Sequence, residues 1–368
     1  IVQEAPAEIL TGRPWARGAV RVKTTNHWQK TLVDIYTSPP VVGGATIASF
    51  GINAICRQYI AFGRQSKIIR FLMQNSAPLL SVVVAVYNGE AFLDQFFTCL
   101  VNQRIDSMEV IIVNDGSTDR SMQIVESWRE KLPQLQVIEQ QNQGVSIARN
   151  TGLAVATGQY LSFPDIDDVF KPGMYQRLLD MAVTQDLDVA TCNGNYVWEN
   201  NKKPSRPIFP EDKLASTDVM TGPAWLKKAL DSRKFLHVTW LNIYRHDFIR
   251  KHSFHFEPGL RHQDIPWTTE VLLAAERVQY TSERFYDYYI HSASVSHTPD
   301  NDDTLIRSAR HYMKILQMLD AINQRYPDKV KNIPACHWQI AKEGLGIIHT
   351  FDNMKDEAKK TMIIKRVL

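Results

Sequence analysis

The segment LLSVVVAV at residues 79–86 constrains the fold most, because it is a nearly unbroken apolar run of strand length. A strand that is buried on both faces has this composition, and such strands are typical of parallel sheets with helices on both sides. Strand-like segments follow at 109–114, 135–140, 160–163 and 187–193, and helix-like segments stand between most of them. This alternation predicts an α/β fold with a mostly parallel, Rossmann-like sheet and helices on both faces.

The second half of the chain is less regular than the first, and it predicts more helix than strand. Residues 237–244 are strand-like, whereas helices are expected at 221–232, 264–276 and 304–323. The first two of these helices carry a proline in the first turn. Backbone N–H groups there have no intrahelical partner, so proline, which lacks an N–H, costs no hydrogen bond. The region after residue 300 is therefore expected to be mainly helical.

The chain has 368 residues, which is long enough for more than one domain. The hydrophobic pattern and the composition divide it into three regions. Residues 1–72 show no steady period of two or 3.6 and form an N-terminal extension without an assigned role. Residues 73–300 form the predicted α/β domain, with one half at 79–193 and the other at 194–300. Residues 301–368 form the predicted helical C-terminal region.

Charge and cysteine usage exclude several functional classes. The formal net charge is +3 and no basic block dominates, which argues against a nucleic-acid partner. The four cysteines lie far apart and form no CxxC pair, which fits a reducing compartment and argues against a zinc site. No secretory signal is evident, and the apolar stretch at 41–55 is shorter than the roughly 20 residues that a membrane-spanning helix needs. We therefore expect a cytoplasmic protein.

Polar residues follow three of the predicted strands, at the edge of a parallel sheet where ligands bind. They are Tyr87, Asn88 and Glu90 after the first strand, Asn114, Asp115 and Asp119 after the second, and Asp165, Asp167 and Asp168 after the fourth. Acidic strand ends suit a ligand whose phosphates arrive with a divalent metal, whereas direct phosphate binding uses Gly-rich backbone or basic side chains. Neither a GxGxxG nor a GxxxxGK[ST] motif follows the first strand, so dinucleotide and P-loop sites lose support.

Carboxylates at these positions can bind a nucleoside directly, because they accept hydrogen bonds from a base N–H or a ribose hydroxyl. Asp115 is placed for the base, and Asp165 is placed for the ribose or for the metal. The alternatives are an acidic surface turn at 165–168 and helix caps at Asp115 and Asp264. Asp168 is expected to cap the following helix or to orient its neighbours.

Four motifs in order carry a specific resemblance: SVVVAVYNGEAFLDQFFTCLVNQ, EVIIVNDGSTDRS, NQGVSIARNTGL and YLSFPDIDD. Together they resemble the nucleotide-sugar domain of glycosyltransferase family 2, which has the GT-A fold. The match is close over 79–193 and looser to about residue 297. The segment from TGPAWLKKALDS to GLRHQDIPWTTE further resembles enterobacterial glycosyltransferases of the lipopolysaccharide core, one of which is a glucuronosyltransferase.

The resemblance implies roles for particular residues. The nucleotide-sugar site would comprise Tyr87, Asn88, Glu90, Asp115, Arg149 and Asp165, with Tyr87, Glu90 and Asp115 on the uracil and ribose and Arg149 facing the nucleotide. Asp165 and Asp167 would form the DxD motif that binds Mn²⁺ or Mg²⁺, with Asp167 the more direct ligand. Asp264 would be the general base. Gln263 stands where many relatives have Glu, and Pro164 replaces the more usual Leu or Val.

The implied activity is an inverting, metal-dependent transfer of a hexose or hexuronic acid from a UDP-sugar to a saccharide acceptor, in lipopolysaccharide core biosynthesis. Asp264 would remove the proton from the acceptor hydroxyl in a single displacement. A sugar-phosphate nucleotidyltransferase and a non-catalytic UDP-sugar-binding protein are the alternatives. The former would normally carry a Gly-rich basic loop after the first strand, and VYNGEAF has none.

Two further features stay open at this level. His291 and His297 either contribute to the metal site or lie on the surface. The basic tail KKTMIIKRVL (359–368) either contacts the inner face of the membrane or is a solvated end.

The extension 1–72 has no counterpart in the family resemblance, and Met73 lies six residues before Leu79, where a family member would begin. We expect Met73 to be the natural initiator. Deleting 1–72 should then leave fold and activity intact, as circular dichroism and a transfer assay on the shortened protein would measure. Loss of soluble protein on deletion would refute this expectation.

Overall fold

The computed structural model describes residues 41–42, 45–46, 77–199, 203–290, 301–357 and 360–361. The chain separates into two compact units, Ile1–Asn75 and Ser76–Leu368. Within the first unit, β1 (Val41–Val42) pairs antiparallel with β2 (Ala45–Thr46). The expectations for Met73, His291, His297 and tail residues 362–368 lie outside the described residues.

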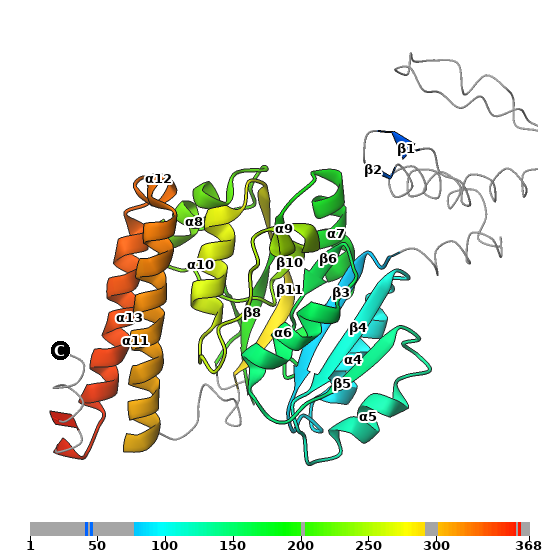
Figure 1. The fold of residues 1–368 in the computed structure, drawn as a ribbon, viewed down its shortest axis with the longest axis horizontal. Coiled ribbons are helices and arrows are strands. Elements are labelled where there is room, and N and C mark those ends of the chain that lie inside the picture. The colour runs from blue at the N-terminus through cyan, green and yellow to red at the C-terminus, as the bar shows by residue number, and fades with distance from the viewer. Residues whose placement is uncertain are drawn as a thin grey trace, which may run out of the picture. The chain divides into compact units, whose positions relative to one another are not determined.

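A mixed sheet organises the second unit, in the order β5-β4-β3-β6-β10-β8-β11-β7, with β9 paired to β8 (Figure 1). The strands are β3 (Leu80–Val86), β4 (Met108–Asn114), β5 (Leu135–Glu139), β6 (Tyr160–Ser162), β7 (Val169–Phe170), β8 (Val189–Trp198), β9 (Arg206–Pro207), β10 (Asn242–Arg245) and β11 (Val278–Ile290). β3 is parallel to β4 and β6, β4 to β5, and β8 to β11, whereas β7, β9 and β10 are antiparallel to their neighbours. The predicted mostly parallel α/β sheet is therefore confirmed.

The apolar run that predicted the first strand lies at the centre of this sheet. β3 pairs with β4 along its whole length, from Leu80 opposite Met108 to Val86 opposite Asn114. The buried carboxylate of Glu109 ties this centre together, because its Oε1 accepts hydrogen bonds from Ser81 Oγ (2.5 Å) and the Gly158 backbone N–H (3.1 Å). A charge-assisted network of this kind offsets the cost of burying the carboxylate.

Seven helices of the described α/β part flank the sheet: α4 (Leu93–Asn102), α5 (Ser121–Ser127), α6 (Val145–Val155), α7 (Met174–Thr184), α8 (Gly222–Asp231), α9 (His246–Lys251) and α10 (Asp264–Ala274). α8 begins as its sequence indicates, since the Thr221 hydroxyl accepts from the Ala224 N–H (3.4 Å) and Pro223 lies in the first turn. α6 packs on β3 and β4, and α10 packs on α8.

A helical region follows the sheet, with α11 (Asp302–Arg325), α12 (Pro327–Val330) and α13 (Ala335–Asp352). Asn301 begins α11 with a capping box that involves Thr304. Figure 1 shows α11 beside α13, with α10 between this pair and the sheet. α10 contacts α11 directly, so the C-terminal helices adjoin the helix that carries Asp264.

Some sequence expectations differ from the structure in extent. Only the last three residues of the strand-like segment 237–244 join the sheet, as the start of β10, because the preceding residues turn, with the Asn242 N–H bonded to the Thr239 carbonyl (3.2 Å). The long strand β11 was not expected, whereas α13 lies in the region 301–368 that was predicted to be helical. β11 lacks a clean period of two, and its pairing with β8 shifts between Tyr280 and Tyr286.

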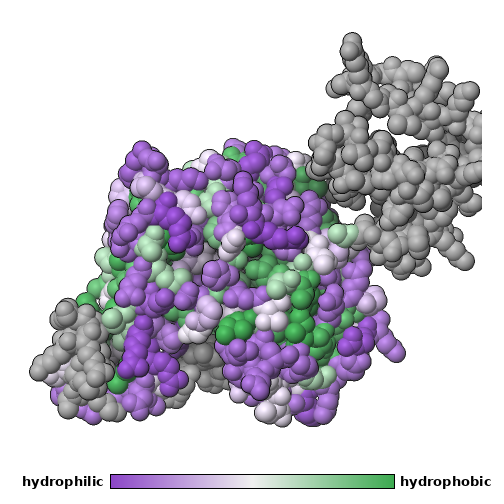
Figure 2. All heavy atoms as spheres, in the orientation of Figure 1, coloured by the Kyte–Doolittle hydropathy of each residue, from purple (hydrophilic) through white to green (hydrophobic). Residues whose placement is uncertain are grey.

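The surface is mainly hydrophilic in the view of Figure 2, with hydrophobic patches near the middle of that face. The large hydrophobic side chains that stay exposed in the described residues include Tyr87, Leu345 and Ile348, at 54%, 62% and 55%. Among the helices that the structure describes, none combines the length and apolarity needed to cross a bilayer.

Candidate active site

The loops after β3 and β4 hold each other through side-chain hydrogen bonds. Asn88 Oδ1 accepts from the Thr118 N–H (2.8 Å), and Glu90 Oε2 accepts from the Arg120 N–H (2.9 Å). Asn88 has a left-handed backbone (φ 49°), which asparagine tolerates better than most residues. Asn88 and Glu90 therefore shape the edge of the site, while the ring of Tyr87 beside them is open to solvent.

Asp115 links β4 to the start of α6. Its carboxylate is buried, and Oδ1 accepts from Gln140 Nε2 (2.7 Å) and from the Gln143 N–H (2.8 Å). Oδ2 accepts from the N–H of Gly144 (2.8 Å), the residue before α6. These bonds position the loop at 140–144 and the first turn of α6, and a carboxylate retains further lone pairs for a ligand.

Arg149 of α6 lies at the centre of the candidate site. Its guanidinium is buried and donates from Nη2 to Asp165 Oδ1 (2.7 Å) and from Nη1 to Asp264 Oδ1 (3.2 Å). The guanidinium also lies over the ring of Phe256, 5.4 Å from the ring centroid. One cation thus joins the acidic segment after β6 to the first residue of α10, although 115 positions separate Arg149 from Asp264 in sequence.

Burial and charge shift the pKa of both carboxyl groups upward. Burial raises the pKa of Asp165 to about 6, with Arg149 opposing the shift and the neighbouring aspartates adding to it. Burial also raises the pKa of Asp264, again against Arg149. Their side chains retain 36% and 21% exposure, against 3% for Arg149, so solvent moderates these shifts. Both carboxylates are therefore accessible to solvent, whereas the arginine that joins them is buried.

β11 holds the acidic segment from the other side. The Tyr286 hydroxyl accepts from the Asp165 N–H (3.3 Å), and its ring stacks on Trp240 with centroids 4.2 Å apart. Asp168 is buried and accepts from the Tyr289 N–H (2.9 Å). Asp168 thus orients its segment against β11 and does not cap α7, whose start has no side-chain cap. The contacts of Tyr286 were not foreseen, because its tyrosine-rich segment has no motif of its own.

Two family models match the chain in succession. Residues 81–249 match glycosyl transferase family 2, and residues 302–368 match the C-terminal domain of glycosyltransferase YibD. The "Uncharacterized glycosyltransferase YibD" of Escherichia coli K12 is 41% identical over 298 residues, which is 80% of this chain and 86% of that protein. The chain belongs to glycosyltransferase family 2. "Uncharacterized glycosyltransferase EpsJ" of Bacillus subtilis is 33% identical over 226 residues, covering 60% of this chain and 64% of EpsJ.

The fold of this family 2 member is also that of a solved transferase. S. aureus TarS 1–349, in a complex with UDP-GlcNAc, superposes with a TM-score of 0.55 at 22% identity, over 68% of this chain and 72% of that one. The same protein in complex with UDP superposes with a TM-score of 0.51 at 23% identity, over 65% of each chain. The resemblance drawn from the four motifs is therefore confirmed at the level of family and fold.

The donor set of the DxD segment fits a hard divalent cation. Asp165 and Asp167 are two positions apart, both partly exposed, and both offer the carboxylate oxygens that Mg²⁺ and Mn²⁺ prefer. The residues that the structure describes contain no group of three or more His, Cys, Asp or Glu side chains that could hold a metal ion by themselves. A cation here would therefore take its other ligands from water and from substrate phosphates, as Mg²⁺ commonly does.

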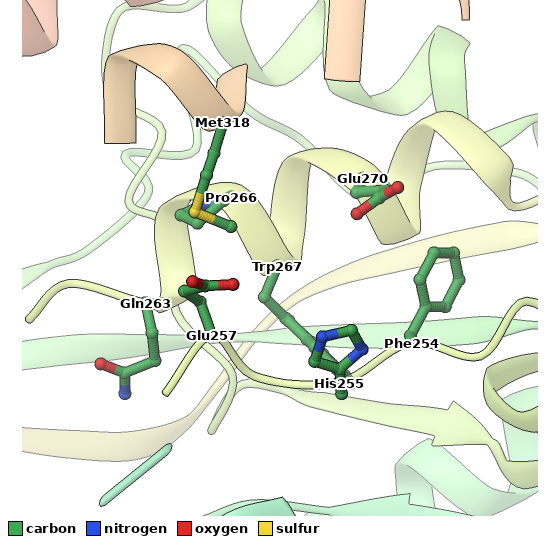
Figure 3. Close-up of a pocket in the computed structure, with 8 residues that line it drawn as sticks. All are labelled: Phe254, His255, Glu257, Gln263, Pro266, Trp267, Glu270 and Met318. Carbon is green, nitrogen blue, oxygen red and sulfur yellow. The ribbon is translucent and has the colours of Figure 1, made fainter. Parts of the chain in front are cut away.

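A small cavity lies beside α10 and is too small for a sugar nucleotide (Figure 3). Its volume of about 20 Å³ has room for one or two water molecules. Gln263, Trp267 and Glu257 line it, and Figure 3 shows Met318 of α11 over Pro266 of α10. The cavity therefore marks packing of the C-terminal helices against α10 rather than a donor site.

The shared arginine generates a stability prediction. Arg149→Met should lower the free energy of unfolding by about 1–3 kcal/mol, less than for a fully buried pair because the carboxylates are partly exposed. A double-mutant cycle with Asp165→Asn should show coupling of at least about 0.5 kcal/mol, measured by urea unfolding. The control is Arg129→Met, which removes a surface pair with Glu126 (2.9 Å) and should cost little. Equal effects at the two arginines would contradict the central role of Arg149.

Proposed function

We propose that this family 2 enzyme is an inverting, metal-dependent glycosyltransferase that moves a hexose or hexuronic acid from a UDP-sugar to a saccharide acceptor. The observation that carries the proposal is the pair of carboxylates on Arg149. Asp165 belongs to the half at 79–193, which we propose binds the nucleotide-sugar, and Asp264 to the half at 194–300, which we propose binds the acceptor. Both bond to one guanidinium. This arrangement brings a donor-binding carboxylate and a candidate base to one point, as a single displacement requires.

The donor would lie across the carboxyl ends of β3 and β4. Tyr87 offers an exposed ring for a base to stack on, and Asp115 offers acceptor oxygens at a site already ordered by three hydrogen bonds. The UDP and UDP-GlcNAc complexes of TarS support a uridine nucleotide as the donor. Asp165 would accept from the ribose or share the metal, and Asp167 would bind the metal directly. When bound there, a divalent cation would neutralise the charge that develops on the departing diphosphate.

Asp264 would take the proton from the attacking acceptor hydroxyl. Arg149 bonds to Oδ1, which leaves Oδ2 to accept that proton, and burial raises the pKa of this carboxyl toward the range of an efficient base. Thr268 of the next turn donates to the Asp264 carbonyl, which fixes the helix start that carries the base. Attack from the face opposite the diphosphate inverts the anomeric carbon and needs no covalent intermediate.

We infer that the acceptor belongs to the lipopolysaccharide core and that the enzyme acts in the cytoplasm, in peripheral contact with the inner membrane face. The support is the resemblance of residues 221–270 to core glycosyltransferases. Screening UDP-sugars for metal-dependent hydrolysis, and then core oligosaccharides for transfer, tests both substrates. Pyrophosphate release from UTP and a sugar phosphate would instead indicate a nucleotidyltransferase, and the absence of UDP release with every acceptor would indicate a binding protein.

The base assignment predicts a separation of binding from turnover. Asp264→Asn should bind UDP as the parent enzyme does, because the amide oxygen can still accept from Arg149. Its kcat should fall by about 10²–10⁴-fold, the usual contribution of a general base. Calorimetry with UDP and a transfer assay measure the two effects. Full turnover in this variant would remove Asp264 from the mechanism.

The three acidic positions after β6 should differ in sensitivity. Asp167→Ala should abolish metal-dependent transfer. Asp168→Asn should be the mildest change, because burial raises the pKa of Asp168 well above its ordinary value and an amide oxygen can still accept from the Tyr289 N–H. Activity titrations with Mn²⁺ and Mg²⁺ compare the variants. A larger loss of activity in Asp168→Asn than in Asp167→Ala would show that Asp168, and not Asp167, is the metal ligand.

A further inference from the structure

A cluster of basic side chains adjoins the candidate base, and the proposed donor site does not use it. We call Arg261, His262, Arg307 and His311 the cationic cluster, after the charges of its two arginines; burial lowers the pKa of His262 to about 4, so its imidazole is neutral. Arg261 and His262 lie in the turn immediately before Asp264, and Arg307 and His311 lie one helical turn apart on α11. The cluster is therefore built jointly by the entry to α10 and by the C-terminal helical region.

Specific contacts hold the two parts of the cluster together. The Arg261 N–H donates to His311 Nδ1 (3.4 Å), and the His262 ring stacks on Tyr312 with centroids 5.6 Å apart. His262 has a left-handed backbone (φ 57°), a conformation that costs energy for a residue with a side chain and that often occurs at functional sites. The turn before Asp264 is thus fastened to α11 in a strained conformation.

The chemistry of the cluster suits an anion. Burial lowers the pKa of His311, and the nearby charges of Arg261 and Arg307 lower it further, so its imidazole is neutral near pH 7. Because Nδ1 accepts from Arg261, the neutral ring carries its proton on Nε2 and can donate there. Arg307 is exposed, and it forms no ion pair with any of the described residues. Guanidinium forks bind phosphate and carboxylate groups strongly.

The place of the cationic cluster next to Asp264 favours contact with the acceptor over contact with the donor. The proposed donor contacts come from residues 87–167, whereas Arg261 and His262 stand three and two positions before Asp264, the residue that would contact the acceptor hydroxyl. An acceptor whose hydroxyl reaches Asp264 would have its neighbouring substituents near this turn and α11.

Building on the proposed transferase function, we propose that the cationic cluster binds an anionic substituent, a phosphate or carboxylate, on the acceptor saccharide. Arg261 and Arg307 supply the two guanidinium groups, and His311 supplies a neutral N–H donor. The enzyme would thereby prefer acidic acceptors over neutral ones of the same sugar sequence.

A binding experiment on the full chain tests the cluster without knowledge of the acceptor. The protein is saturated with UDP, so that the donor site is filled, and is titrated with inorganic phosphate at low ionic strength. Arg307→Gln should weaken phosphate binding about tenfold. The matched control is Arg310→Gln, an exposed arginine on the same helix whose loss changes the net charge equally. Arg310 directly precedes His311, so its side chain points to a different face of the helix, whereas Arg307 shares the face of His311. Equal weakening in both variants, or none in Arg307→Gln, would overturn the proposal.

A kinetic experiment distinguishes the acceptor from the donor as the source of the anion. A phosphorylated core oligosaccharide and the same oligosaccharide after phosphatase treatment are compared as acceptors. Removal of the phosphate should raise the acceptor KM about tenfold for the parent enzyme and little for Arg307→Gln, with the donor KM unchanged. A change confined to the donor KM would place the anion on the donor sugar and contradict the proposal. Failure to bind UDP would count against the proposed function, whereas UDP binding without a phosphate effect would count against this inference alone.

Discussion

The geometry of the candidate active site depends on the ion pairs of the buried Arg149 guanidinium. Two carboxylates placed this close in a partly desolvated site would repel each other, and the cation between them makes the arrangement tolerable. Its own position is set by α6, and the start of α6 is set by the hydrogen bonds of Asp115 at the end of β4. A continuous series of polar contacts thus runs from the centre of the sheet to the first residue of α10.

The core of the sheet could be predicted from sequence because its strands are buried on both faces. β3, β4 and β6 are mainly apolar and almost wholly buried, and the observed strands begin and end within a residue or two of the expected ones. β11 was not predicted, because it mixes charged and aromatic residues without a regular alternation and shifts its register against β8. The segment at 237–244 was apolar enough for a strand, but tertiary packing turned its first half into a loop.

Asp115, Asp165 and Asp167 could be proposed together from the sequence because strand ends in a parallel sheet meet at one edge, whereas Asp264 was proposed only through the family resemblance. Their partners could not, because those contacts are purely tertiary. Arg149 bonds to Asp264 across 115 positions, and Asp168 bonds to the Tyr289 backbone across 121. The polar bonds of Asn88 and Glu90 likewise show that residues at a strand end can shape a loop as well as offer groups to a ligand.

The packing of α11 on α10 bears on how such enzymes diversify. The turn that leads into Asp264 is bonded to His311, so the residue proposed as the base is directly coupled to the C-terminal helices, while the contacts proposed for the nucleotide lie in the first half of the sheet. If Arg307 and His311 bind the acceptor as proposed, exchange of the C-terminal helices between relatives would change the acceptor preference without changing the sugar nucleotide that is used. Recombination at the junction near residue 300 is thus a route by which one lineage could acquire new acceptors without rebuilding its chemistry.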